Sequence, residues 1–120
     1  MAQRASPVVH LELHSRDRER AAGFFRVLCG WEPEDIAVGD SHYLAIDTGR
    51  RGVGGGIVES RGSPPLWLPY VAVADVVRAT GRACALGASV LLDPRAGPAG
   101  SRSVVEMPAG GRLAFWQYRE

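Results

Sequence analysis

The chain opens on an alternation of apolar and polar residues. From Val8 to His14 every second residue is apolar, a pattern that predicts a strand with one apolar face. The other face of this strand carries His10, Glu12 and His14. Three short strands are predicted further on, at 31–36, 42–47 and 55–59.

A helix is predicted between the first strand and these three. Asp17 is a typical N-cap residue, and Gly30 is a typical C-terminal stop. Between them, apolar residues follow at helical spacing, which predicts one stripe against a sheet. The stripe consists of Ala21, Phe24, Phe25 and Leu28.

The same order of elements repeats after the linker Gly62–Pro65. Asp75 lies 58 residues after Asp17, and Gly87 lies 57 residues after Gly30. The second helix would pack through Val76, Ala79, Ala83 and Leu86, and its strands are predicted at 68–73, 90–92, 103–107 and 113–117. A repeat of this length is typical of a unit that cannot bury its apolar face alone. The pattern therefore predicts an α+β fold of two tandem βαβββ modules, 1–62 and 63–120, forming a curved mixed sheet (a cup) with helices on the outside. The alternative is an ordinary α+β domain with two similar starts.

Composition narrows the function classes. The 120 residues suffice for a single domain, 1–120, and the net charge of +1 without a basic stripe argues against nucleic-acid binding. All basic residues are arginine, which excludes a Schiff-base lysine and a P-loop lysine. No apolar run is long enough for a membrane span or a signal peptide, so no membrane partner is expected. Cys29 and Cys84 are expected to be free, buried thiols, which predicts a cytoplasmic location.

Four segments together carry a family resemblance. The first, 10–25, holds a strand His, an Asp seven residues on and a helix with an aromatic pair, and 28–31 is a Leu-x-Gly turn. The others are 65–76, with its Trp-x-x-Tyr-Val-x-Val-x-Asp-Val pattern, and the closing strand 108–117. In order and spacing the chain resembles the glyoxalase/bleomycin-resistance/dioxygenase (vicinal-oxygen-chelate, VOC) family over nearly its whole length.

The resemblance implies four metal-ligand positions on the concave face, usually His or Glu. In this sequence they fall on His10, Gly56, Leu68 and Ala114. Only His10 can donate a lone pair to a metal ion, so the sequence predicts no metal site and no cofactor. The alternative is a divalent ion held by replaced ligands.

Six residues are predicted to line the cup by strand parity: His10, Glu12, His14, Tyr70, Arg112 and Trp116. Three of them, His10, Glu12 and Tyr70, are candidates for acid/base catalysis. The other interpretations are a polar cavity wall, an unorthodox metal site on the first strand, and rings that merely close the core. The set opposite in parity, which includes Phe115, should pack beneath the helices.

The resulting function is a metal-free protein that holds an apolar or aromatic small molecule in the cup. The alternative is a VOC-type lyase, isomerase or dioxygenase, and a third interpretation is a dimerising or regulatory module with a closed cup. A homodimer is also predicted, because edge strands and the Leu66–Trp67 segment need covering. The sequence does not identify the ligand, and the cup could form within one chain or between the two chains of a dimer.

Overall fold

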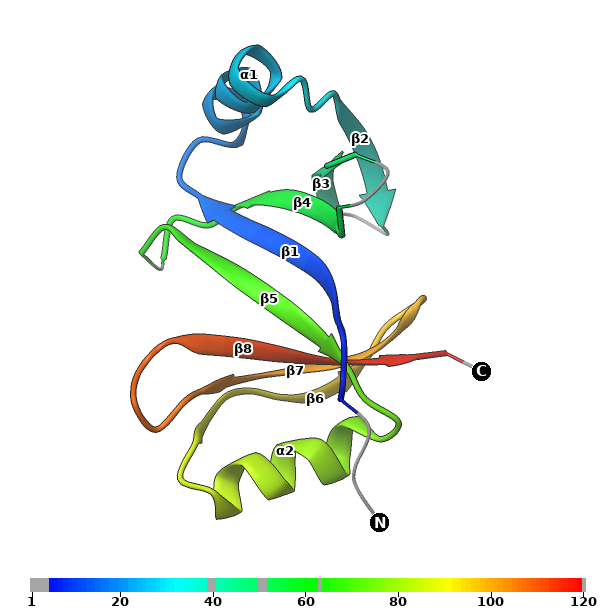
Figure 1. Ribbon diagram of the computed structural model, residues 1–120, viewed down its shortest axis with the longest axis vertical. Helices are drawn as coiled ribbons and strands as arrows, with labels where there is room; N and C mark the ends of the chain where they lie inside the picture. Colours follow the sequence, from blue (N-terminus) through cyan, green and yellow to red (C-terminus); the bar gives the residue numbers. More distant parts are fainter. Residues whose placement is uncertain (1–4, 39–40, 50–51, 63, 120) are drawn as a thin grey trace. The chain divides into compact units, whose positions relative to one another are not determined.

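The computed structural model describes residues 5–38, 41–49, 52–62 and 64–119. Each half of the chain folds as strand, helix and three strands (Figure 1). The first half comprises β1 (Val8–Ser15), α1 (Arg18–Cys29), β2 (Pro33–Val38), β3 (Ser41–Ile46) and β4 (Gly54–Glu59). The second comprises β5 (Leu66–Ala72), α2 (Val76–Ala85), β6 (Ser89–Ala96), β7 (Gly100–Glu106) and β8 (Arg112–Tyr118). The predicted α+β class with two βαβββ modules is confirmed.

The chain divides into two compact units, which are described separately. One unit is His10–Leu68, here called the first unit, and the other is Met1–Val9 with Pro69–Glu120, the second unit. The segment before His10 joins the second unit through a backbone hydrogen bond from Ala72 N to Pro7 O of 3.0 Å.

In the first unit the strands run in the order β2-β3-β4-β1. β1 and β4 are parallel, whereas β3 is antiparallel to both β2 and β4. The buried core lies between one face of this sheet and α1. It consists of Ala22, Leu44, Ile46 and Ile57, with Leu13, Ala21, Phe25 and Trp31 packed against it. Leu13 in the core confirms the predicted parity of β1, whose polar residues therefore lie on the face away from α1.

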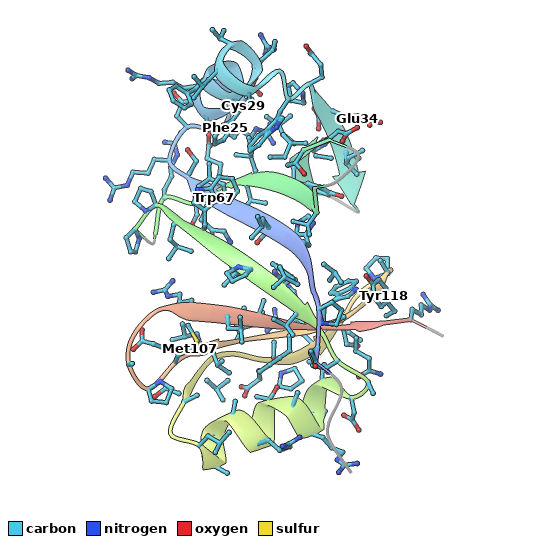
Figure 2. The ribbon with its side chains drawn as sticks, viewed as in Figure 1. Phe25, Cys29, Glu34, Trp67, Met107 and Tyr118 are labelled. Atoms are coloured by element: carbon cyan, nitrogen blue, oxygen red, sulfur yellow. The ribbon has the colours of Figure 1, made fainter. Side chains whose placement is uncertain are left out.

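The start and end of α1 follow the sequence prediction, but its buried stripe is narrower. The Asp17 side chain caps the helix by accepting a hydrogen bond from Arg20 N, and Gly30 adopts the left-handed conformation, with φ of 70°, beyond its end. Phe25 packs inward, whereas Phe24 and Leu28 are 61% and 68% exposed. Their assignment to the buried stripe was wrong, because the helix is turned so that the small Ala22 meets the sheet. Figure 2 shows Phe25 on the sheet side of α1, and its ring lies 5.8 Å from that of Trp67.

In the second unit the order is β5-β8-β7-β6, with β5 and β8 parallel and the remaining pairs antiparallel. α2 packs on one face, where Thr80 Oγ1 and the fully buried Ser103 Oγ lie 2.7 Å apart. The Gln117 side chain of β8 accepts from Val76 N at the start of this helix. The predicted contact of Leu86 was wrong, since Leu86 follows the last turn of α2 and is 77% exposed.

Two further expectations need correction. β6 was predicted only at 90–92, but it runs from Ser89 to Ala96 and continues through Pro94. The register of β6 against β7 shifts on both sides of Leu92, and an irregular outer strand tolerates a residue without an N–H group. Cys29 and Cys84 are free but exposed, because they lie on the outward sides of the helices, so burial of the thiols was wrong. No helix in the described part of the chain is long and apolar enough to cross a membrane.

Candidate functional site

The His10 side chain lies beside the glycines of β4. In the β1–β4 register His10 pairs with Gly54, and Glu12 pairs with Gly56. A Cβ atom on Gly56 would stand 3.4 Å from His10 Nε2 and 3.3 Å from the Tyr43 ring. The imidazole and the Tyr43 ring therefore occupy the space that side chains on β4 would fill. β4 begins at Gly54, one residue before the predicted range 55–59, and its glycines accommodate His10.

Burial sets the charge of His10. Removal from solvent lowers the pKa of its imidazole, and the neighbouring Glu12 carboxylate opposes this more weakly by raising it. The folded chain therefore holds His10 neutral at pH 7, with a ring nitrogen that can accept a proton or a hydrogen bond.

Glu12 and His14 form a pair on the same face of β1. His14 Nε2 lies 2.7 Å from Glu12 Oε1, and the two side chains are 21% and 15% exposed. A carboxylate at this distance orients the imidazole and, when the ring is protonated, stabilises its charge. The structure thus brings together two of the three polar residues predicted on this strand, while His10 packs toward β4.

In the second unit the face of the sheet away from α2 carries an aromatic cluster. The rings of Tyr70 and Trp116 are 6.4 Å apart, and those of Trp116 and Tyr118 are 6.0 Å apart, both pairs edge-to-face. Tyr70 is 5% exposed, and its hydroxyl accepts a hydrogen bond of 2.9 Å from Arg102 Nη1. The cluster thus combines apolar ring surface with a guanidinium, a typical composition for a small-molecule site.

The alternation along β8 agrees with the predicted parity. Phe115 pairs with Ser103, the residue bonded to Thr80 of α2, so it lies on the helix-covered face. Trp116 pairs with Arg102 on the opposite face, and Arg112, also on that face, pairs with Glu106. It stays a prediction that one ligand is bound by all six residues: His10, Glu12, His14, Tyr70, Arg112 and Trp116.

The residues at the family's metal positions do not fit a metal ion. Gly56 has no side chain, and Leu68 and Ala114 are 1% and 0% exposed and have no donor atom. Across the described part of the chain, no three His, Cys, Asp or Glu side chains lie close enough to hold an ion. These residues favour a metal-free protein, which stays a prediction that metal analysis can test.

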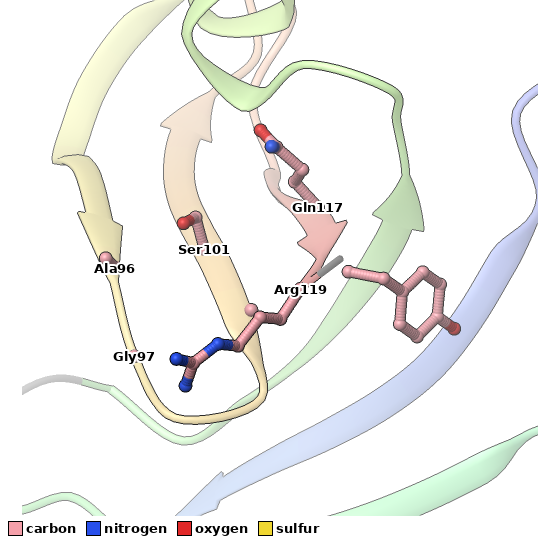
Figure 3. A pocket seen from close by; sticks show the side chains of 7 residues that line it. Ala96, Gly97, Ser101, Gln117 and Arg119 are labelled. Carbon is pink, nitrogen blue, oxygen red and sulfur yellow. The ribbon is translucent and has the colours of Figure 1, made fainter.

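Two open hollows lie elsewhere. One, of about 490 Å³, lies beside the β6–β7 turn and the end of β8, where Figure 3 shows Ala96, Gly97, Ser101, Gln117 and Arg119. The other, of about 390 Å³, lies over the start of α1 and includes Arg16, Arg20 and Phe24. Of the six predicted site residues, none lines either hollow.

Sequence reasoning missed Arg102 and Tyr118. Both belong to β7 and β8, which begin or end beyond the predicted ranges 103–107 and 113–117. The signal was present, since Arg102 continues the alternation of its strand two residues before Val104.

Comparisons with known proteins place the fold. No family model and no curated protein sequence matches the chain. Among solved structures, a hypothetical protein from Bacillus halodurans C-125 is similar with a TM-score of 0.71 and 12% identity, over 98% of this chain and 97% of that one. Methylmalonyl-CoA epimerase from Mycobacterium tuberculosis has a TM-score of 0.67 and 12% identity, over 94% of this chain and 88% of that one. A methylmalonyl-CoA epimerase in complex with methylmalonyl-CoA and NH4+ has a TM-score of 0.61 and 15% identity, over 94% of each chain. These likenesses show that the chain shares the fold of the methylmalonyl-CoA epimerases, and they confirm the fold that the resemblance in the sequence implies.

Proposed function

We propose that the chain is a metal-free binding protein for a small apolar or aromatic molecule. The binding residues lie, in each unit, on the sheet face that its helix does not cover, here called the helix-free face. One observation carries the proposal: these faces bear partly buried polar and aromatic side chains rather than a solvated surface. In the first unit the residues are His10, Glu12 and His14, and in the second Tyr70, Arg112 and Trp116. Ring surface beside a few oriented polar groups is the typical composition of a small-molecule site, so these side chains favour a ligand.

The similar structures support this proposal without identifying the ligand. A protein of the same fold binds methylmalonyl-CoA, a small acyl group on a large cofactor. At 12–17% identity the ligand does not carry over to this chain. A cytoplasmic location and a homodimer, expected from the sequence, complete the proposal.

The test is a thermal-shift screen of small aromatic and apolar metabolites, because a ligand that binds only the folded state raises the melting temperature. Trp116→Ala should abolish the shift with little loss of stability. Trp67→Ala is the matched control, since Trp67 lies beside Phe25 on the helix side and should keep the response. If no compound raises the melting temperature, or if both variants respond like the native protein, the proposal fails.

A metal-independent acid/base enzyme is the second candidate. It is favoured by the neutral His10 and by the Glu12–His14 pair, which supply a proton acceptor and an oriented imidazole. Mass spectrometry of a bound compound after incubation in D₂O tests it, because proton abstraction would introduce deuterium. Exchange that His10→Gln removes would establish the enzyme, whereas a compound recovered without deuterium favours simple binding.

A further inference from the structure

The second unit carries a positive site on the face away from α2. Arg102 of β7 pairs directly with Arg95 of β6 on one side and with Trp116 of β8 on the other. Like charges opposite each other on neighbouring strands destabilise a sheet unless something compensates them. Among the described residues, neither arginine has a carboxylate within ion-pair distance.

Arg102 is also held in place. Its Nη1 donates to the hydroxyl of Tyr70, whose ring is buried and packed edge-to-face on Trp116. β8 runs between the strands of Tyr70 and Arg102, and there the paired residue of Tyr70 is Ala114. A methyl group at this position leaves room for the phenol to reach across to Arg102. The small residue at a family metal position therefore serves a different contact here.

A guanidinium fixed at one nitrogen keeps further N–H donors in a planar fork that matches a carboxylate or a phosphate. Less freedom is then lost when an anion binds, which strengthens the interaction. The adjacent Trp116 ring offers apolar contact for the body of the same molecule.

We propose that the ligand is a small apolar or aromatic acid whose carboxylate or phosphate binds Arg102, beside Arg95, while its body lies on Trp116. This inference rests on the proposed binding function and specifies its ligand class. It assigns to Arg102 a role that fixes the orientation of the ligand as well as its charge.

The experiment is a titration of the full chain, followed by NMR, with three probes of one shape: phenylacetate, phenyl phosphate and the neutral phenylacetamide. We expect an anion to bind at least about tenfold more tightly than the amide, which corresponds to ~1.4 kcal/mol. The affinities of phenylacetate and phenyl phosphate, compared with each other, show whether the site prefers a carboxylate or a phosphate. Arg102→Gln should remove that preference while leaving amide binding in place. Arg78→Gln on α2 is the matched control for charge and should change nothing.

Salt gives an independent readout. Raising the ionic strength from about 0.05 M to about 0.5 M should weaken binding of the anions to the native protein and leave the amide unchanged. Equal binding of anions and amide, or equal losses in Arg102→Gln and Arg78→Gln, would overturn the anion site while the proposed function stands. If none of the probes binds at about 10 mM, this inference is refuted, and the thermal-shift screen decides the proposed function separately.

Discussion

The three consecutive glycines of β4 give the sharpest stability prediction. A Cβ atom on Gly55 would lie 2.8 Å from Ile46 Cγ1 and 3.3 Å from Leu11 O, inside the core of the first unit. Ile46 is 4% exposed and belongs to the buried cluster, so it has little space to move. On Gly54, one residue earlier, the nearest atom would be His10 Nδ1 at 4.0 Å, an ordinary contact.

Overpacking of a core costs about 1–3 kcal/mol. Replacing glycine by alanine returns about 0.4–1 kcal/mol by restricting the unfolded chain. Gly55→Ala should therefore lower the free energy of unfolding by about 1–2 kcal/mol, or the melting temperature by roughly 4–8 °C. Gly54→Ala should lie within about 0.5 kcal/mol of the native protein.

The assay is equilibrium unfolding in urea, followed by far-UV circular dichroism, for both variants. If Gly55→Ala is as stable as Gly54→Ala, β4 does not pack against Ile46 in this register. The assignment of His10 to the opposite face would then fall as well.

Three further predictions concern α2, His10 and metal. Thr80→Val should lower the free energy of unfolding by about 1–3 kcal/mol, because it leaves the buried Ser103 hydroxyl without its partner. Ser103→Ala should lower it less, because Thr80 then stays bonded to Val76 O. Equal, negligible losses of both variants in urea unfolding would refute this contact. Because the pKa of His10 is lowered from 6.5 in the folded chain, the unfolded chain binds more protons below that value, so stability should fall as pH drops through about 6.5. His10→Gln should flatten this part of the stability curve, and an unchanged slope would contradict the burial of the ring. Protein purified without affinity-tag metal should contain substoichiometric zinc, nickel, manganese or iron, and its melting temperature should not change with chelator. One tightly bound ion per chain would contradict the metal-free protein and favour a metal-dependent enzyme.

The order of elements was predictable because local signals determine it. Asp17 and Asp75 cap their helices, and Gly30 takes the positive φ that stops the first one. The alternation in β1 separated Leu13 from the polar residues correctly, since a strand has only two faces.

The contacts across strands were not predictable in the same way. Whether Phe24 or Ala22 meets the sheet depends on how α1 is turned, and an apolar stripe in the sequence leaves that angle open. The hydrogen bond between Arg102 and Tyr70 joins residues 32 positions apart, and it depends on a small residue on the strand between them. The role of Gly54 and Gly56 likewise became visible only from the register of β1 against β4.

The central claim is that the helix-free faces bind a small molecule, and amide and side-chain chemical-shift mapping of the protein with the tightest compound from the thermal screen tests it most directly. The account predicts saturable shifts at His10, Glu12, Tyr70 and Trp116, with Phe115 and the residues of α2 unchanged. Shifts confined to α1, to α2 or to Phe115 would contradict it, because the ligand would then occupy the helix-covered side of the sheets.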